Sequence, residues 1–294
     1  MSYPPPMPQR PRSSSKPPGG RPSGKPGGKP SGKSKPGRGG RRPGPAERSD
    51  GRLELRNPHA AYEVLQRRPH DAVELLVAGD GGPAWTRVFA GCDEHRVAIR
   101  RLTADDSRDR RDRTSEGRRT GVALVVEPPP VARFNAMIAE TKRDQPGLWL
   151  TLEQVQDVRN LGAIFRTAAF FGIRGIILTK DRSASLTAIA CDTAAGGVET
   201  LPHCVVTNLA RTLAAARDEY GLRIVGASEH ATQPVADVAT DVDTLLVLGN
   251  EEKGLRRLTR EHCDVLTAIP GTGGIGSLNV SVAAGILIDR LLPR

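Results

Sequence analysis

Short apolar runs alternate with amphipathic segments from residue 121 to the end of the chain. The apolar runs predict strands, and the segments with apolar residues at helical spacing predict helices. Strands are predicted at 122–126, 148–152, 175–178, 205–206, 222–225, 245–248 and 265–269, and helices at 131–142, 161–171, 209–218, 255–261 and 277–291. Because strands that alternate with helices are typically parallel, this region predicts an α/β fold with a mostly parallel sheet covered on both faces.

A second, smaller α/β pattern precedes this region. Residues 51–104 predict helices at 58–66 and 83–94 and strands at 73–78 and 96–102. The glycine-rich sequence Gly79-Asp80-Gly81-Gly82 follows the first of these strands. It allows either nucleotide binding or a simple turn, and its shortness favours the turn. Residues 105–120 mix both charges without an apolar pattern, which predicts an exposed linker between two domains.

The first fifty residues differ in composition from the rest of the chain. They hold 12 Lys and Arg against two acidic residues, and this leaves 31 basic and 31 acidic residues in 51–294. The net charge of +10 therefore belongs to a Pro/Gly-rich tail, predicted to be disordered because it cannot bury a core. The tail either tethers RNA through its cations or only keeps the protein soluble, and its sequence alone does not separate the two.

Cysteine spacing and hydropathy bear on metal ions and membranes. Cys92, Cys191, Cys204 and Cys263 form no CxxC pair, so we expect buried thiols in a reducing compartment, with no zinc site and no disulfide. No apolar run approaches the ~18 residues that span a bilayer. We expect a soluble, cytoplasmic protein with neither a metal nor a membrane partner.

Two glycine-rich turns follow neighbouring strands near the C-terminus. They are Gly249–Gly254 after the strand at 245–248 and Pro270–Gly276 after the strand at 265–269. Ligands of open α/β sheets bind where strand ends meet helix starts, so the two turns predict a pocket walled by main chain. The second contains GxGxxG, but only 18 residues follow Gly276, too few for a dinucleotide-binding unit. This disfavours an NAD-dependent enzyme, and Ser277 is instead expected to cap the last helix.

Arg166 is the candidate anion-binding residue of the helix at 161–171. We expect Asn160 to cap this helix and Gly162 to leave the surface beside Arg166 open. The guanidinium fork then suits a phosphate or carboxylate, although a plain surface arginine fits this segment equally well. Glu251 in the first glycine-rich turn either caps a helix or orients Arg166, and capping is the simpler explanation.

Taken together, three segments resemble the three sequence motifs of the SpoU/TrmH family of RNA ribose 2′-O-methyltransferases. They are Asn160–Arg166, Leu248–Gly254 and Ile269–Ala283, while 181–184 and 255–263 are similar to the family's ribosomal-RNA guanosine branch. The resemblance implies an α/β SPOUT fold with a C-terminal trefoil knot at 121–294 and a small RNA-binding domain at 51–104. It also implies S-adenosyl-L-methionine as cofactor, a homodimer, and rRNA or tRNA as partner, with rRNA guanosine preferred.

The resemblance assigns the site residues as well. The implied catalytic residues are Arg166, Asn160, Glu251, Ser277 and Asn279, and the implied cofactor-binding residues are Leu248, Gly249, Gly254, Ile269, Gly276 and Leu278. An arginine side chain holds its proton too strongly to be a good base, so we favour a role for Arg166 as an electrostatic anchor over that of general base. The competing hypothesis is a non-catalytic RNA-binding or ribosome-assembly protein that retains the fold.

Overall fold

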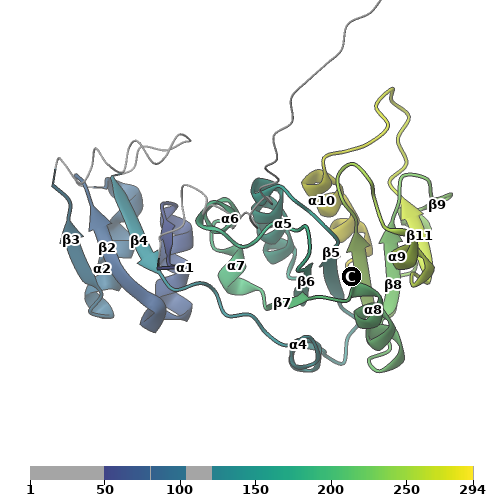
Figure 1. Cartoon of the computed structure of the whole chain (residues 1–294), viewed down its shortest axis with the longest axis horizontal. Coiled ribbons are helices and arrows are strands. Elements are labelled where there is room, and N and C mark those ends of the chain that lie inside the picture. Colours follow the sequence, from purple (N-terminus) through teal and green to yellow (C-terminus); the bar gives the residue numbers. More distant parts are fainter. Residues whose placement is uncertain (1–49, 80, 104–120, 294) are drawn as a thin grey trace, which may run out of the picture. The chain divides into compact units, whose positions relative to one another are not determined.

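The computed structural model describes residues 50–79, 81–103 and 121–293. These residues form two β-sheets with helices packed against them (Figure 1). The predicted tail at 1–50 and linker at 105–120 lie outside the described residues, apart from Asp50.

The smaller sheet has four strands in the order β1-β4-β2-β3. β4 is antiparallel to both of its neighbours, whereas β2 and β3 run parallel and are connected through α2. The strands are β1 (Leu53–Leu55), β2 (Ala72–Val77), β3 (Ala98–Arg101) and β4 (Val122–Val126). The helices are α1 (Pro58–Arg67) and α2 (Thr86–Glu94), with single 3₁₀ turns η1 (Pro69–Asp71) and η2 (Pro83–Trp85).

β4 corrects the predicted boundary between the domains. The sequence grouped 122–126 with the larger sheet, but Val126 pairs with both Leu53 and Ala72 in the smaller one. An apolar run of five residues is compatible with a central strand of either sheet, and only strand pairing decides between them. We therefore propose that the small domain comprises 51–104 together with β4, and that the larger domain begins after it.

The larger sheet has seven strands in the order β7-β6-β5-β10-β8-β11-β9, and every pairing is parallel, as predicted. The strands are β5 (Leu148–Leu152), β6 (Gly175–Thr179), β7 (His203–Val206), β8 (Arg223–Ala227), β9 (Gln233–Pro234), β10 (Thr244–Leu248) and β11 (Val265–Ala268). The helices are α4 (Phe134–Thr141), α5 (Val158–Phe171), α6 (Ala188–Ala194), α7 (Gly197–Thr200), α8 (Leu209–Asp218), α9 (Arg257–Glu261) and α10 (Val280–Leu291), with the 3₁₀ turn η3 (Val235–Asp237).

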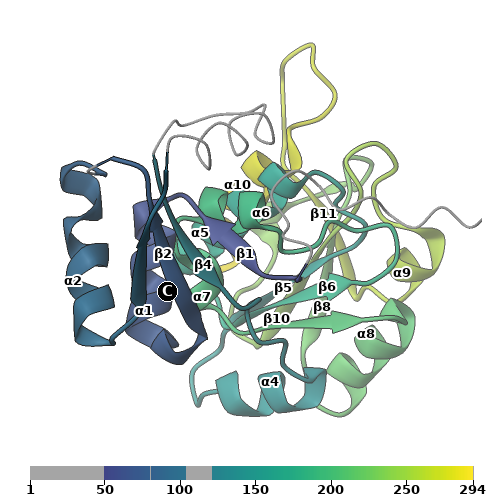
Figure 2. The same cartoon turned by 60° about the vertical axis from the view of Figure 1, so that its left-hand side comes forward.

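Helices cover both faces of the larger sheet, which confirms the layered α/β prediction. Figure 2 shows α5, α6 and α10 above the sheet and α4 and α8 below it. Alternation along β10 explains the two layers, because Leu246 and Leu248 join the core under the first group. Leu245 and Val247 join the core under the second group. The sequence did not predict β1, β9, α6 and α7, which are short and, in α6, rich in alanine.

The predicted burial of the cysteines is confirmed for three of the four. All four cysteines are free; Cys92, Cys191 and Cys204 are buried, and Cys263 is partly buried. Burial raises the pKa of each thiol to about 12, so these groups stay protonated and unreactive near neutral pH. Within the described residues, no helix has the length and apolar character needed to cross a membrane, and no cluster of three or more His, Cys, Asp or Glu is suited to a metal ion.

Partly buried polar contacts join the smaller sheet and its helices to α6 and α7. The main-chain N–H groups of Arg56 and Asn57 each donate to the Asp192 carboxylate over 2.9 Å. The guanidinium of Arg68 donates two hydrogen bonds, of 2.7 and 3.0 Å, to the Glu199 carboxylate. These contacts place charged groups in an interior where each depends on its partner.

His203 predicts a pH dependence of stability. The ring is 2% exposed and packs edge-on against Phe165, with 5.7 Å between ring centroids. Burial lowers the pKa of His203 to about 4, a hydrogen bond at the Leu201 main chain opposes this, and Arg68 adds to it. In the unfolded chain His203 has an ordinary histidine pKa of about 6.5, so the unfolded state takes up a proton more readily than the folded state does. The folded protein therefore keeps its full stability above about pH 6.5 and loses stability as the pH falls toward 4. Urea titrations between pH 7 and 4 should show a loss of up to about 3 kcal/mol that the variant His203→Gln lacks.

Identical pH profiles for the two proteins would contradict this assignment. The comparison is between slopes with pH, so a constant loss of stability in His203→Gln does not affect the test.

Candidate active site

Three parallel strands of the larger sheet end at the same edge and lead into the predicted motifs (Figure 1). β5 and β10 are hydrogen-bonded neighbours, and β11 is separated from β10 by β8. β5 continues into α5, β10 into α9, and β11 into α10. This edge, where parallel strands end and helices begin, is where ligands of open α/β sheets bind.

The start of α5 differs from the prediction. Asp157 is its N-cap, and the Asp157 carboxylate accepts from the N–H groups of Arg159 at 2.6 Å and Asn160 at 3.2 Å. Asn160 was predicted to cap the helix but lies within its first turn. Its amide is therefore available for other contacts: it donates to Glu251 over 3.4 Å and accepts from Asn279 over 3.1 Å. One residue from each of the three motifs thus meets at a single point.

The loop after β10 is closed by its own main chain and by Asn250. Asn250 and Gly254 exchange main-chain hydrogen bonds of 3.2 and 2.9 Å. The Asn250 side chain accepts from the N–H groups of Glu252 and Lys253 at 3.1 Å, and donates to the Gln154 carbonyl oxygen at 2.9 Å and to Glu251 at 3.2 Å. Sequence reasoning passed over Asn250, although an asparagine after a glycine in a short loop is a common turn former.

The structure leaves no room for a side chain at position 249. A Cβ atom there would lie 2.2 Å from the carbonyl carbon of Gly254, and Gly254 itself has a φ of +61°. The variant Gly249→Ala should therefore open the loop and weaken binding of S-adenosylmethionine at least about tenfold, since a main-chain atom cannot move aside as a side chain can. Isothermal titration of the cofactor measures this. Gly285→Ala on α10 (Val280–Leu291) is the matched control, because the nearest atom to its Cβ position, Cγ2 of Thr167, lies at an ordinary contact distance of 3.5 Å, and equal effects would contradict the prediction.

Glu153 stabilises the segment that follows the β10 loop, and the sequence did not single this residue out. Its side chain follows β5 directly and is buried, with 3% exposed. It accepts from the Arg256 N–H at 3.0 Å and from the Thr259 hydroxyl at 2.7 Å, so it holds the start of α9 against the end of β5. A glutamate that directly follows an apolar strand was the available signal, because a buried carboxylate requires partners.

The loop between β11 and α10 is the most exposed of the three. It extends away from the sheet in both views (Figures 1 and 2), and the residues from Gly271 to Asn279 are all exposed. No atom lies within 4 Å of the Cβ positions of Gly271, Gly273 and Gly276. Leu278 is 51% exposed. The main chain of this segment is therefore open to a ligand.

The cap of α10 was also predicted incorrectly. Asn279, not Ser277, is the N-cap, and its side-chain oxygen accepts from the Ser281 N–H at 2.9 Å and the Ser281 hydroxyl at 2.6 Å. Ser277 lies two residues earlier in the exposed loop and, within the described residues, makes no hydrogen bond to Asn160, Glu251 or Asn279. An asparagine is as good an N-cap as a serine, so the choice depended on where the helix could pack.

Arg166 is exposed on α5, but its surroundings differ from the expectation. The surface beside Gly162 is filled by α6, because a Cβ atom at Gly162 would lie 2.4 Å from the Ala190 carbonyl oxygen. Gly197 packs on the Arg166 main chain, with its Cβ position 3.0 Å from the Cα atom. The Glu251 carboxylate binds the side chains of Asn160 and Asn250, and no ion pair joins it to Arg166 in the described part of the chain. The guanidinium is therefore left available for an external anion.

The predicted cofactor-binding residues combine apolar side chains with exposed main chain. Leu248 is buried and Ile269 is partly buried, so both strand ends are apolar and Ile269 leaves part of its side chain accessible. The open main chain of the glycine loop offers donors and acceptors, and the buried Gln154 amide nitrogen has no hydrogen-bond partner among the residues that the structure describes. This combination fits a small molecule with both apolar and hydrogen-bonding parts. Fold and site together define a parallel α/β protein whose strand ends carry groups suited to such a ligand.

Comparison with known proteins defines the family. The model of the SpoU rRNA Methylase family matches residues 147–289. The chain is 43% identical over 242 residues to the 23S rRNA (guanosine-2′-O-)-methyltransferase RlmB of Pseudomonas aeruginosa, covering 80% of this chain and 93% of that one. It is 37% identical to an uncharacterized tRNA/rRNA methyltransferase of Mycolicibacterium gilvum, covering 78% of this chain and 75% of that one. The chain belongs to the SpoU rRNA methylase family.

A solved structure supports the fold. The SpoU methyltransferase AviRb from Streptomyces viridochromogenes, solved in complex with the cofactor AdoMet, matches with a TM-score of 0.69 at 20% identity. The match covers 82% of this chain and 89% of that chain. The similarity therefore extends beyond the larger sheet to most of the described residues.

Proposed function

We propose that this protein transfers a methyl group from S-adenosyl-L-methionine to the ribose 2′-oxygen of a guanosine in 23S rRNA. The observation that carries the proposal is the meeting of Asn160, Glu251 and Asn279, one from each motif, at the strand ends of a chain with 43% identity to RlmB. Of the RNAs open to the family, ribosomal RNA is favoured because the relative is similar over 93% of its length.

The cofactor site is assigned to the strand ends. Leu248, Gly249 and Gly254 would hold the cofactor from the β10 loop, and Ile269, Gly276 and Leu278 would hold it from the loop before α10. When bound, S-adenosyl-L-methionine supplies a methyl group on a positively charged sulfur. With the cofactor in place, the apolar side chains would exclude water from its reactive part, and the bare main chain of the loops would provide hydrogen bonds.

Arg166 is proposed to bind the RNA phosphate and to stabilise negative charge as the 2′-oxygen loses its proton. The guanidinium suits this role because its planar fork of N–H donors matches the geometry of a phosphate and it carries no acceptor. Asn160, Glu251 and Asn279 would position the ribose, because their mutual hydrogen bonds limit side-chain motion before substrate arrives. Ser277 would join them from the exposed loop.

Several wider features of the family belong to the same proposal. A trefoil knot is supported by the path of the C-terminal chain. β11 and β10 lie on opposite sides of β8, and after β11 the chain returns across the sheet so that α10 packs against α5 and β10. A homodimer is supported by the exposed Phe170 on α5 and Val282 on α10. The small domain would bind RNA, the basic tail would add a salt-dependent contact, and the protein would act in the cytoplasm.

The proposal is tested by methyl transfer. Purified protein, tritiated S-adenosylmethionine and either 23S rRNA or total tRNA are incubated, and the product is digested to locate the modified nucleoside. A 2′-O-methylguanosine in 23S rRNA supports the proposal, and its disappearance from ribosomal RNA of a deletion strain identifies the position. Labelling of tRNA alone would move the substrate to tRNA. No labelling of either RNA, with the cofactor bound, would favour the non-catalytic alternative.

A further inference from the structure

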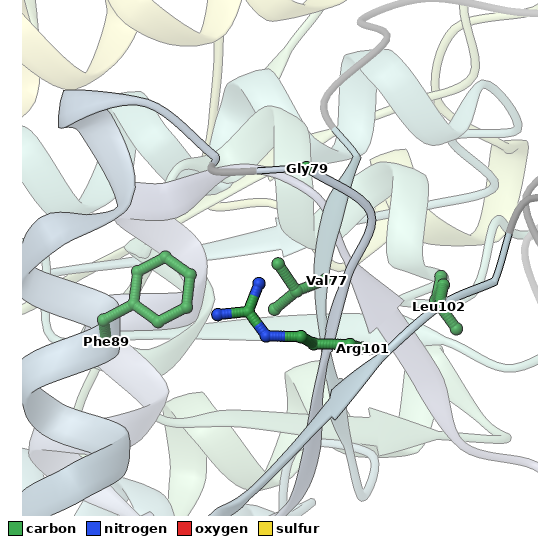
Figure 3. A pocket seen from close by; sticks show the side chains of 5 residues that line it. All are labelled: Val77, Gly79, Phe89, Arg101 and Leu102. Atoms are coloured by element: carbon green, nitrogen blue, oxygen red, sulfur yellow. The ribbon is translucent and has the colours of Figure 1, made fainter.

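The glycine-rich turn after β2 belongs to a cavity in the small domain. The cavity has a volume of about 480 Å³ and is lined by Val77, Gly79, Phe89, Arg101 and Leu102 (Figure 3). Its size lies within the range of about 300–1,000 Å³ typical of small-ligand sites. None of these residues takes part in the candidate active site.

The position of the cavity follows from the topology of the small sheet. β2 and β3 are parallel, so their carboxyl ends lie at one edge of the sheet. The cavity is lined by the last residue of each strand, Val77 and Arg101, and by Gly79 and Leu102, which follow β2 and β3. This is the same relation of strand end and ligand as in the larger sheet. Gly79 has a φ of +98° and no atom within 4 Å of its Cβ position, so the cavity is open to solvent on the side of this residue.

Phe89 and Arg101 form the two walls that matter for recognition. Figure 3 shows the Arg101 guanidinium directed toward the Phe89 ring, with Val77 beside it. The Phe89 ring lies beside Gly81, since a Cβ atom built at Gly81 would be 3.4 Å from its Cε2 atom. All four residues of β3, including Arg101, are exposed, and within the described residues no carboxylate forms an ion pair with Arg101. An aromatic ring opposite a free guanidinium suits a flat, electron-rich ring system.

We infer that this cavity binds one unpaired base of the RNA substrate, stacked on the Phe89 ring and covered by the Arg101 guanidinium. The inference rests on the proposed RNA substrate and adds a second contact in the small domain. Among the described residues that line the cavity, only Arg101 is charged, so these residues offer a free nucleotide few partners for its ribose and phosphates. A base on a longer RNA gains its remaining affinity from contacts elsewhere on the protein, which is why we assign the site to RNA.

Matched variants separate stacking from general charge. Arg101→Gln and Phe89→Leu alter the cavity, whereas Arg100→Gln removes the same charge from the adjacent residue of β3, whose guanidinium is bonded to Glu74 at 2.8 and 3.2 Å. Fluorescence anisotropy with a labelled oligoadenylate of about twelve nucleotides measures RNA affinity. We expect the dissociation constant to rise at least about fivefold in the two cavity variants and less than about twofold in Arg100→Gln. Equal losses in all three would overturn the inference, as would no loss in the cavity variants.

A change in the ligand provides the second arm. An abasic oligonucleotide of equal length should bind wild type and Arg101→Gln with similar affinity, because there is no base for the cavity to hold. Adenosine monophosphate should fail to compete with the oligoadenylate; efficient competition would reassign the cavity to a free nucleotide. Thermal melting confirms that each variant is folded before it is compared.

Methyl transfer is measured on the same proteins, so that the inference and the proposed function can fail separately. If wild type methylates no RNA but its binding depends on Phe89 and Arg101, the cavity assignment stands and the enzymatic proposal fails. If the wild type methylates RNA but its RNA affinity is unchanged in the Phe89 and Arg101 variants, the cavity assignment fails and the enzymatic proposal stands.

Discussion

Replacing Arg166 with alanine is expected to reduce kcat for methyl transfer at least about hundredfold, with the affinity for S-adenosylmethionine changed less than about twofold. The guanidinium is exposed on α5 and free of ion pairs within the described residues, whereas the predicted cofactor residues lie on the β10 and β11 loops. Its removal should therefore affect the stabilisation of charge on the ribose oxygen and leave the cofactor site intact. Single-turnover methylation and calorimetric titration of the cofactor measure the two quantities separately.

Arg211→Ala is the matched control for this experiment. Arg211 lies on α8, which covers the opposite face of the larger sheet, so the variant loses the same charge at a distance from the strand ends. Arg166→Lys should fall between alanine and wild type, because it keeps the charge but not the two-pronged geometry. Turnover at the wild-type rate in Arg166→Ala would remove Arg166 from the catalytic role.

Replacing Arg68 with methionine is expected to lower the free energy of unfolding by about 3–5 kcal/mol. Arg68 is 6% exposed and reaches Glu199 at 2.7 Å, Asp71 at 3.2 Å and the Glu127 carbonyl oxygen at 2.8 Å. Burial lowers the pKa of Arg68, but Glu199 and Asp71 outweigh this and raise it overall, so the residue is charged in the fold. Methionine fills a similar volume and leaves the buried Glu199 carboxylate without its partner, which is the costly event.

Arg67→Met is the control from the preceding position. Arg67 is half exposed and pairs with Glu63 over 3.0 Å along the surface of α1. A pair of this kind contributes at most about 1 kcal/mol. Urea denaturation should therefore show a much larger loss of unfolding free energy for Arg68→Met than for Arg67→Met. Similar losses in the two variants would mean that the contact between Arg68 and Glu199 does not hold the small domain against α7.

Much of the larger sheet was predictable because apolar periodicity reports burial directly. Strands such as 245–248 are buried on both faces and read as continuous apolar runs, and α8 was predicted with its observed bounds, 209–218. The same pattern failed for β4, since an apolar run records that a strand is buried but not which strands it pairs with. Short elements such as α7 bury too few residues to produce a detectable period.

The sequence by itself determined the class of fold, the three motif segments and their position after strands, because these depend on local patterns of apolar residues and glycines. Only the tertiary structure decided which residues meet. Asn160 contacts Glu251 and Asn279, which lie 91 and 119 positions away, and Glu153 reaches Thr259 across 106 positions. The caps at Asp157 and Asn279 likewise depended on where each helix could pack. Contacts between distant residues follow from how strands order themselves in a sheet, and no local pattern records that order.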